Sequence, residues 1–221
     1  YIVVEADESD ASFLNLMPIM AVVTMIYGFL MYLPQKDMKR LLAYSTMTQL
    51  SLIFMALSLS IFGSKMAFNG GVAHIFNHAF AKSLFFLVAG ALSYSCGTRM
   101  LPSVRGLLRH MPLLGIGFCI AALSITVVPP FNGFFSKFPI FTAGFQLSSE
   151  HLLLLPFVVL ALLESVASFA WFLCWFGETT PGEASEAVAN AAPVPLAIQL
   201  VLSVLIVMCV ASSFIAASWL G

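Results

Sequence analysis

The chain has 221 residues, of which 61% are apolar and only 9% are charged, with a formal net charge of −1. This composition excludes a disordered chain, a basic nucleic-acid-binding surface and an ordinary soluble enzyme, because soluble domains carry roughly 25% charged residues. The mean hydropathy of +1.01 instead predicts an all-α integral membrane protein. Since a spanning helix needs ~20 apolar residues, the length allows about six spans.

Residues 1–15 differ from the rest of the chain, because four of the ten acidic residues lie between positions 5 and 10. An apolar run at 1–4 followed by this acidic stretch predicts a buried strand that ends in a loop, as in a soluble α/β domain. We therefore expect a foreign head over 1–15 and a membrane domain over 16–221. Because the chain begins with Tyr1, we also expect it to be a fragment.

Six apolar segments follow in chain order, at 16–33, 41–62, 71–95, 112–147, 152–177 and 195–219. The fourth is too long for one straight helix, and Pro129-Pro130 interrupts it by removing backbone donors. Irregular backbone inside a membrane is tolerated only where protein or a water-filled cavity surrounds it. We expect six to seven transmembrane helices with a broken helix around 128–133. Whether 112–147 crosses the membrane once or twice is left open.

Basic residues gather in the loops 34–40 and 96–111, which the order of spans puts on one side of the membrane. The positive-inside rule then makes that side cytoplasmic. The four cysteines are far apart and form no metal-ligand spacing, so we expect no metal site.

Three ionisable residues lie at i, i+4 and i+8 in the third apolar segment: His74, His78 and Lys82. This spacing puts them on one face of a helix, about one turn apart. Histidine titrates near neutral pH and a buried lysine can lose its proton, so the stripe is typical of a proton relay. The alternative is a polar stripe that joins helices by hydrogen bonds.

Two further ionisable residues lie within apolar segments. Lys137 follows the predicted break and belongs either to the relay or to a helix end from which it snorkels. Glu164 lies in the middle of the fifth segment, with Lys137 or Lys82 as the expected charge partner, and a structural ion pair is the alternative. From spacing alone, Asp37, Lys39 and Arg40 indicate an ordinary interfacial charge cluster.

Three motifs occur in a recognisable order: residues 37–46 (DMKRLLAYST), 74–86 (HIFNHAFAKSLFF) and 129–137 (PPFNGFFSK). Together they resemble the signatures of the antiporter-like membrane subunits of complex I, multisubunit cation/proton antiporters and energy-converting hydrogenases. The resemblance covers about residues 24–221. Residues 77–97 and the PPFNGFFSKFP stretch are most similar to component D of hydrogenase 4.

The resemblance implies a fold of fourteen helices with two inverted repeats, each containing a broken helix, of which this chain resembles the second. It also implies a central polar axis that conducts protons and contains Lys39, His74, His78, Lys82 and Lys137, with Asp37 and Glu164 as potential charge partners. The implied partners are other membrane and hydrophilic subunits in a bacterial inner membrane. No redox cofactor, catalytic centre or nucleic acid is expected.

Residues 1–14 (YIVVEADESDASFL) resemble instead the Mur ligase that joins L-alanine to UDP-N-acetylmuramate, and the likeness continues to Thr24. We therefore expect a chimera, natural or from sequence assembly, joined near 19–26. Ligase function is not expected, since the chain contains no phosphate-binding GxxxxGK[ST] motif.

The sequence thus predicts a proton-translocating or coupling membrane subunit of a hydrogenase 4-type or complex I-like oxidoreductase. A cation/proton antiporter subunit is one alternative, because the motifs are shared. A non-conducting, truncated membrane scaffold is another, because the first repeat is missing.

Overall fold

The protein is a bundle of long helices, seen in a computed structural model that describes residues 8–218, with side chains from residue 16 onward. The long elements are α1 (Glu8–Tyr32), α2 (Met38–Ile61), α3 (Lys65–Ser95), α5 (Pro112–Ile125), α6 (Asn132–Ser148), α7 (Leu155–Thr179) and α9 (Leu196–Ala217). The short ones are the 3-10 turns η1 (Leu101–Ser103) and η2 (Leu152–Leu154), and the helices α4 (Leu107–His110) and α8 (Glu186–Ala189). The predicted all-α fold is confirmed.

The beginning of the chain differs in part from expectation. The strand predicted at 1–4 lies outside the described residues. Helix α1 begins at Glu8, so the second half of the predicted head is helical and continuous with the first apolar segment. A boundary at residue 15 therefore does not separate two elements of secondary structure.

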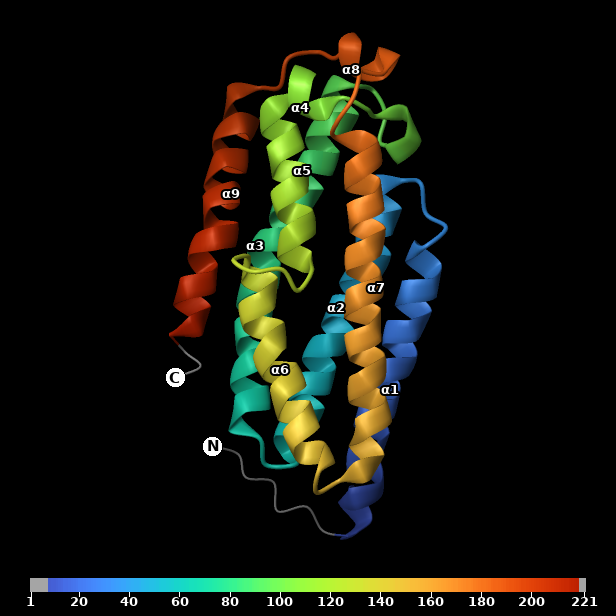
Figure 1. Cartoon of the computed structure of the whole chain (residues 1–221), viewed down its shortest axis with the longest axis vertical. Helices are drawn as coiled ribbons and strands as arrows, with labels where there is room; N and C mark the ends of the chain where they lie inside the picture. The colour runs from blue at the N-terminus through green and yellow to red at the C-terminus, as the bar shows by residue number, and fades with distance from the viewer. Residues whose placement is uncertain (1–7, 219–221) are drawn as a thin grey trace.

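The fourth apolar segment forms one broken crossing. Helix α5 occupies the upper half of the bundle and α6 the lower half, and residues 126–131 join them at mid-height (Figure 1). At ~1.5 Å per residue, neither helix is long enough to span a bilayer alone. The question that the sequence left open is thus answered, because the two halves together cross the bundle once.

Helix α3 begins earlier than the sequence predicted. The third apolar segment was expected to begin at residue 71, but the helix begins at Lys65, where the Ser64 hydroxyl caps it by accepting from the Ala67 amide at 3.2 Å. A Cβ atom at Gly70 would lie 2.9 Å from Ile140 Cγ1. The glycine therefore allows α3 to approach α6 closely instead of forming a turn.

Apolar side chains form two buried clusters, one toward each end of the bundle. One gathers residues of α2, α3, α5, α7 and α9 near the loops 96–111 and 180–195, and the other gathers residues of α1, α2, α3, α6 and α7 near the opposite end. Among the described residues, four helical segments are long and apolar enough to cross a membrane, at Met38–Ile61, Lys65–Ser95, Leu152–Thr179 and Leu196–Ala217. Shorter apolar helices lie at Leu16–Tyr32 and Pro112–Ile125.

The two basic loops meet at one end of the bundle. Arg99 Nε lies 2.6 Å from Asp37 Oδ2, and the amide of Met38 donates to the Arg99 carbonyl at 3.0 Å. Burial alone would raise the pKa of Asp37, but hydrogen bonds from Arg99 and from two backbone amides at the start of α2 hold it below its usual range. The predicted placement of both loops on one side is therefore correct.

Candidate functional site: a buried polar layer

Between the two apolar clusters lies a layer of buried polar side chains, which we call the polar layer. Its members come from five helices and are at most 7% exposed, except for the half-buried His78. They are Tyr32 of α1; Ser45, Thr48 and Gln49 of α2; His74, Asn77, His78 and Lys82 of α3; Asn132, Ser136 and Lys137 of α6; and Glu164, Ser165 and Ser168 of α7. Polar groups at this depth must satisfy one another, because lipid offers no hydrogen bonds.

The backbone break positions the α6 part of this layer. The Asn77 side-chain amide donates to the Asn132 carbonyl at 2.8 Å, and the Asn132 amide donates to the Asn77 carbonyl at 2.9 Å. This reciprocal pair ties α6 to the middle of α3. A Cβ atom at position 133 would overlap the carbonyl oxygens of Ser124 and Thr126, so only glycine allows α6 to begin this close to the end of α5.

His74 bridges α2 and α6 through both ring nitrogens. Nε2 lies 3.2 Å from Gln49 Oε1, and Nδ1 lies 2.9 Å from Ser136 Oγ. Because the glutamine oxygen only accepts, a neutral ring carries its proton on Nε2 and accepts from Ser136. The Ser136 hydroxyl can instead donate to the carbonyls of Asn132 and Gly133, at 3.2 and 3.3 Å, so it can turn when His74 gains a second proton.

Lys82 is buried at 6% exposure and donates to neutral oxygens of α2. Its Nζ lies 2.8 Å from Ser45 Oγ and 3.2 Å from the Leu42 carbonyl. Both acceptors are neutral, so nothing in direct contact fixes this amine in its charged state.

His78 lies between His74 and Lys82 on α3. The two imidazole rings have centroids 5.8 Å apart, and His78 is close enough to Lys82 and Lys137 to interact electrostatically with both. Its Nε2 is buried and has no hydrogen-bond partner in the described part of the protein. This nitrogen can therefore accept a proton from a bridging water without first breaking a bond to protein.

Lys137 and Glu164 form the α6–α7 part of the layer. Lys137 is fully buried and donates to Ser165 Oγ at 3.3 Å, and Glu164 is 7% exposed and accepts from Ser168 Oγ at 2.6 Å. The two charges interact electrostatically, but the direct ion pairs among the described residues include only Asp37–Arg99. Glu164 thus lies near a lysine, as expected, but each of the two charged groups binds a hydroxyl group instead of the other charge.

Two predicted residues lie outside the layer. Lys39 is exposed in the first turn of α2, and Asp37 caps the same helix, where its carboxylate accepts from the Lys39 amide at 2.9 Å. Both lie at the end of the bundle that carries the loops 34–40 and 96–111, which we call the loop end. There the direct charge partner of Asp37 is Arg99.

Sequence reasoning missed several members of the layer: Tyr32, Ser45, Thr48, Gln49, Ser136, Ser165 and Ser168. Part of the signal was available, since Ser45 and Gln49 lie four residues apart in an apolar helix, as do Glu164 and Ser168. Tyr32 gives no such signal, because a tyrosine near a span end more often belongs to an interfacial belt.

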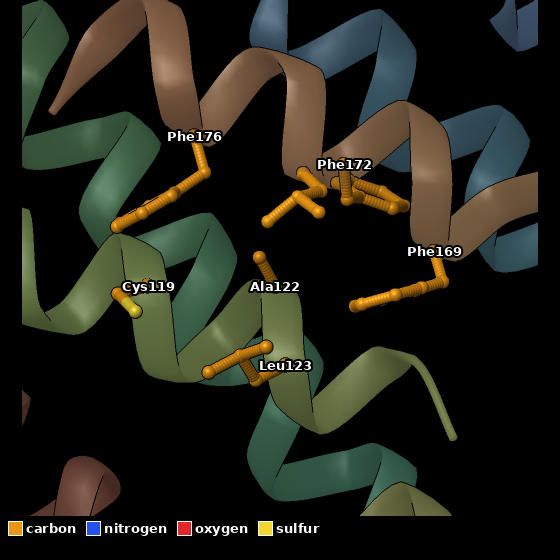
Figure 2. A pocket seen from close by; sticks show the side chains of 7 residues that line it. Cys119, Ala122, Leu123, Phe169, Phe172 and Phe176 are labelled. Carbon is orange, nitrogen blue, oxygen red and sulfur yellow. The ribbon is translucent and has the colours of Figure 1, made fainter. Parts of the chain in front are cut away.

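A separate cavity of about 140 Å³ lies between α5 and α7. Figure 2 shows that aromatic rings of α7 face small and apolar side chains of α5 across this space; the labelled residues are Cys119, Ala122, Leu123, Phe169, Phe172 and Phe176. A cavity with this apolar lining does not hold ordered water. It therefore does not extend the polar layer.

Comparisons of this chain with known proteins, by sequence and by structure, agree on one family. The model of the NADH:quinone oxidoreductase/Mrp antiporter transmembrane family matches residues 2–164, a range that includes the segment with ligase-like sequence. The antiporter subunit named mnhD2 of Staphylococcus aureus is 29% identical over 197 residues, covering 89% of this chain and 38% of that protein. The Na(+)/H(+) antiporter subunit A1 of Staphylococcus haemolyticus is 30% identical over 209 residues, covering 86% of this chain and 26% of that protein.

Solved structures share the fold. A chain of the Mrp complex from Dietzia sp. superposes with a TM-score of 0.82 at 19% identity, covering 96% of this chain and 46% of that one. A chain of the membrane-bound sulfane sulfur reductase, an archaeal respiratory membrane complex, gives a TM-score of 0.77 at 26% identity, covering 98% and 42%. This chain therefore spans less than half the length of these relatives, and it belongs to the NADH:quinone oxidoreductase/Mrp antiporter transmembrane family.

Proposed function

We propose that this chain is the proton-conducting part of a membrane subunit in a hydrogenase 4-type or complex I-like oxidoreductase complex of the bacterial inner membrane. Other subunits would carry the redox chemistry, and this chain would couple it to proton movement. The observation that carries the proposal is the polar layer itself. Within it, Lys82, His74 and Lys137 contact neutral hydrogen-bonding groups, and the Nε2 atom of His78 has no partner among the described residues. Each of the four can therefore change its charge without breaking a direct ion pair.

In the proposed mechanism, a proton enters at the loop end near Lys39, which lies about one helical turn from Leu42. Lys82, whose Nζ lies 3.2 Å from the Leu42 carbonyl, takes up this proton as the neutral amine and becomes an ammonium group. The proton then passes through His78 and His74 to Lys137, with water bridging the gap at His78. Turning of the Ser136 hydroxyl accompanies the change at His74. A charge change in a neighbouring subunit would drive each transfer.

The hydrogenase-type assignment is supported by the resemblance of residues 77–97 to component D of hydrogenase 4. The wider assignment to an oxidoreductase complex is supported by the likeness, at 26% identity, to a chain of a respiratory membrane complex. The basic loops at 34–40 and 96–111 support a cytoplasmic location for that end of the bundle.

A second candidate function is that of a cation/proton antiporter subunit. The observation that favours it is that both curated relatives carry the name of an antiporter subunit. A sodium gradient imposed on proteoliposomes that contain the parent complex distinguishes the two candidates. Proton movement driven by sodium without a redox substrate supports the antiporter, and movement that needs the redox substrate supports the oxidoreductase.

The central test is Lys82→Met in the intact parent complex reconstituted into proteoliposomes. We expect proton uptake to fall at least ~100-fold, because a proton-transferring side chain contributes ~10²–10⁴-fold to its step. Lys65→Met, at the exposed start of α3, is the matched control and should leave uptake unchanged. Unchanged uptake by an assembled Lys82→Met complex would refute the relay.

The origin of the first 24 residues is a separate proposal. We infer from their likeness to the Mur ligase that they derive from a different gene. Long-read sequencing of the source DNA across codons 1–60 tests this directly. An uninterrupted membrane-protein gene with different residues 1–20 would make the head an artefact of sequence assembly. An in-frame junction would instead favour a fusion that acts as a non-conducting scaffold.

A further inference from the structure

Glu164 is a buried ionisable residue of the polar layer, and the proposed relay assigns no role to it. A carboxylate inside the membrane is costly and usually has a functional reason. At 7% exposure, Glu164 has hydroxyl groups as its closest partners, and the described part of the chain gives it no direct ion pair. A carboxylate present only for stability would be expected to form such a pair or to accept several amide hydrogen bonds.

The carboxylate lies within electrostatic reach of both buried lysines. It interacts with Lys137 of α6 and with Lys82 of α3, which themselves repel each other. The hydroxyl of Ser165, next to Glu164 on α7, accepts from Lys137, and Thr48 of α2 contacts the carboxylate. Glu164 is therefore the common negative neighbour of the two ammonium groups at either end of the relay.

A chain of hydroxyl groups leads from Glu164 to the end of α1. Ser168 donates to Glu164 Oε1 at 2.6 Å, and the Ser168 oxygen is hydrogen-bonded to the hydroxyl of Tyr32. Ser168 is 2% exposed and Tyr32 is fully buried, yet Tyr32 is the last residue of α1 and the loop 33–37 follows it directly. Hydroxyl groups both donate and accept, as proton transfer along a chain requires.

We propose that Glu164 carries protons and opens a branch of the polar layer, which runs through Ser168 and Tyr32 to the end of α1. The branch rests on the proposed function, because it needs Lys137 to exchange protons. The Lys137 ammonium gives its proton to the Glu164 carboxylate, which leaves a neutral amine and a carboxylic acid. Glu164 then donates to Ser168 while the Ser168 proton passes to Tyr32 and the Tyr32 proton leaves to water at the loop. Each hydroxyl gains one proton and loses one.

The first test is Glu164→Gln in the parent complex in proteoliposomes, with Glu150→Gln in the exposed loop after α6 as the matched control. We expect Glu164→Gln to slow proton uptake at least ~10-fold and the control to leave it unchanged. Glu164→Asp retains an exchangeable carboxyl group and should restore a substantial part of the rate. Equal loss with aspartate and glutamine would overturn the proposal, because it would indicate a role in packing alone.

The second test removes only the tyrosine hydroxyl. Tyr32→Phe should slow uptake to the same extent as Glu164→Gln, at least ~10-fold, because it removes the last hydroxyl through which the branch passes its proton. Tyr27→Phe, on the exposed face of the same helix, is its control. An unchanged rate in Tyr32→Phe would remove Tyr32 from the branch and overturn it.

Infrared difference spectra add a readout that a structural role would not change. During turnover, a carboxylic-acid C=O band should appear in the wild-type complex and be missing in Glu164→Gln.

The combined results distinguish an error in the branch from an error in the relay. If Lys82→Met abolishes uptake while Glu164→Gln pumps normally and the band is missing in the wild type, the branch is wrong and the relay stands. If Lys82→Met also pumps normally, the relay itself is wrong.

Discussion

Charged side chains form a direct ion pair at the loop end but bond to hydroxyl groups in the polar layer. At the loop end, Asp37 and Arg99 form a direct ion pair, and backbone amides of α2 complete the bonding of the carboxylate. In the middle of the bundle, Lys82, Lys137 and Glu164 lie near one another but bond through hydroxyl groups. The first arrangement holds two loops together, and the second leaves each charge free to change.

The difference follows from the surroundings of each pair. Water next to the loops solvates both charges and limits the value of any surface ion pair to ~0–1 kcal/mol. Within the bundle, a direct ion pair would be strong and would fix both groups in their charged states. Serine and threonine hydroxyls between the charges weaken this fixation. At the loop end, charge serves to hold the loops together, whereas we propose that it serves proton exchange in the layer.

The largest expected effect comes from the break that positions the layer. Gly133→Ala should destabilise the protein by about 3 kcal/mol, at the upper end of the range for overpacking, because the new methyl group overlaps the carbonyl oxygens of Ser124 and Thr126. Thermal unfolding in detergent measures it. Gly90→Ala, where nothing lies within 4 Å of the new Cβ, is the control and should unfold at or above the wild-type temperature. Normal stability of Gly133→Ala would mean that the break does not hold α6 in place.

Lys137→Met separates function from stability most directly. Proton uptake should fall ~100-fold, while the unfolding temperature should change little, because Lys82 remains near Glu164 and the carboxyl group can take up a proton. Parallel measurements of uptake and thermal unfolding check both parts. A large loss of stability would mean that Lys137 acts as a structural partner of Glu164, as Asp37 does for Arg99.

Ser136→Ala tests the switching hydroxyl. It removes the hydrogen bond to His74 and should destabilise the protein by about 1 kcal/mol and slow uptake severalfold. Ser149→Ala removes an exposed hydroxyl that bonds the Gln146 carbonyl and should change neither quantity measurably. Uptake at the wild-type rate in Ser136→Ala would exclude this hydroxyl from the relay.

The smallest effect is expected at the loop end. Since the pKa of Asp37 is lower in the folded protein than its ordinary value of 3.8, its contribution is present above that value and is lost as the pH falls through the folded pKa. Asp37→Asn should cost less than ~1 kcal/mol at neutral pH and should remove this acid-dependent loss. Thermal unfolding of both proteins between neutral and acidic pH checks it. An unchanged acid response in the variant would assign the loss to other carboxylates.

Much of the fold could be read from the chain. Six apolar segments and Pro129-Pro130 predicted the helices and the break, because hydropathy and missing backbone donors act locally. The start of α3 at Lys65 was placed at residue 71, because a pair of glycines weakens a helix in isolation. The close approach of α6 at Gly70 is a tertiary contact that the local sequence does not reveal.

The sequence by itself determined that His74, His78 and Lys82 share a helix face and that Lys137 follows a break, because helical periodicity is a property of the chain alone. Tertiary structure decided which helices meet that face. It brought Glu164 within electrostatic reach of two lysines, put Ser165 against Lys137 and Ser168 against Tyr32, and left Lys39 at the surface. Such contacts join residues far apart in the chain, and no local pattern encodes which apolar helices pack side by side.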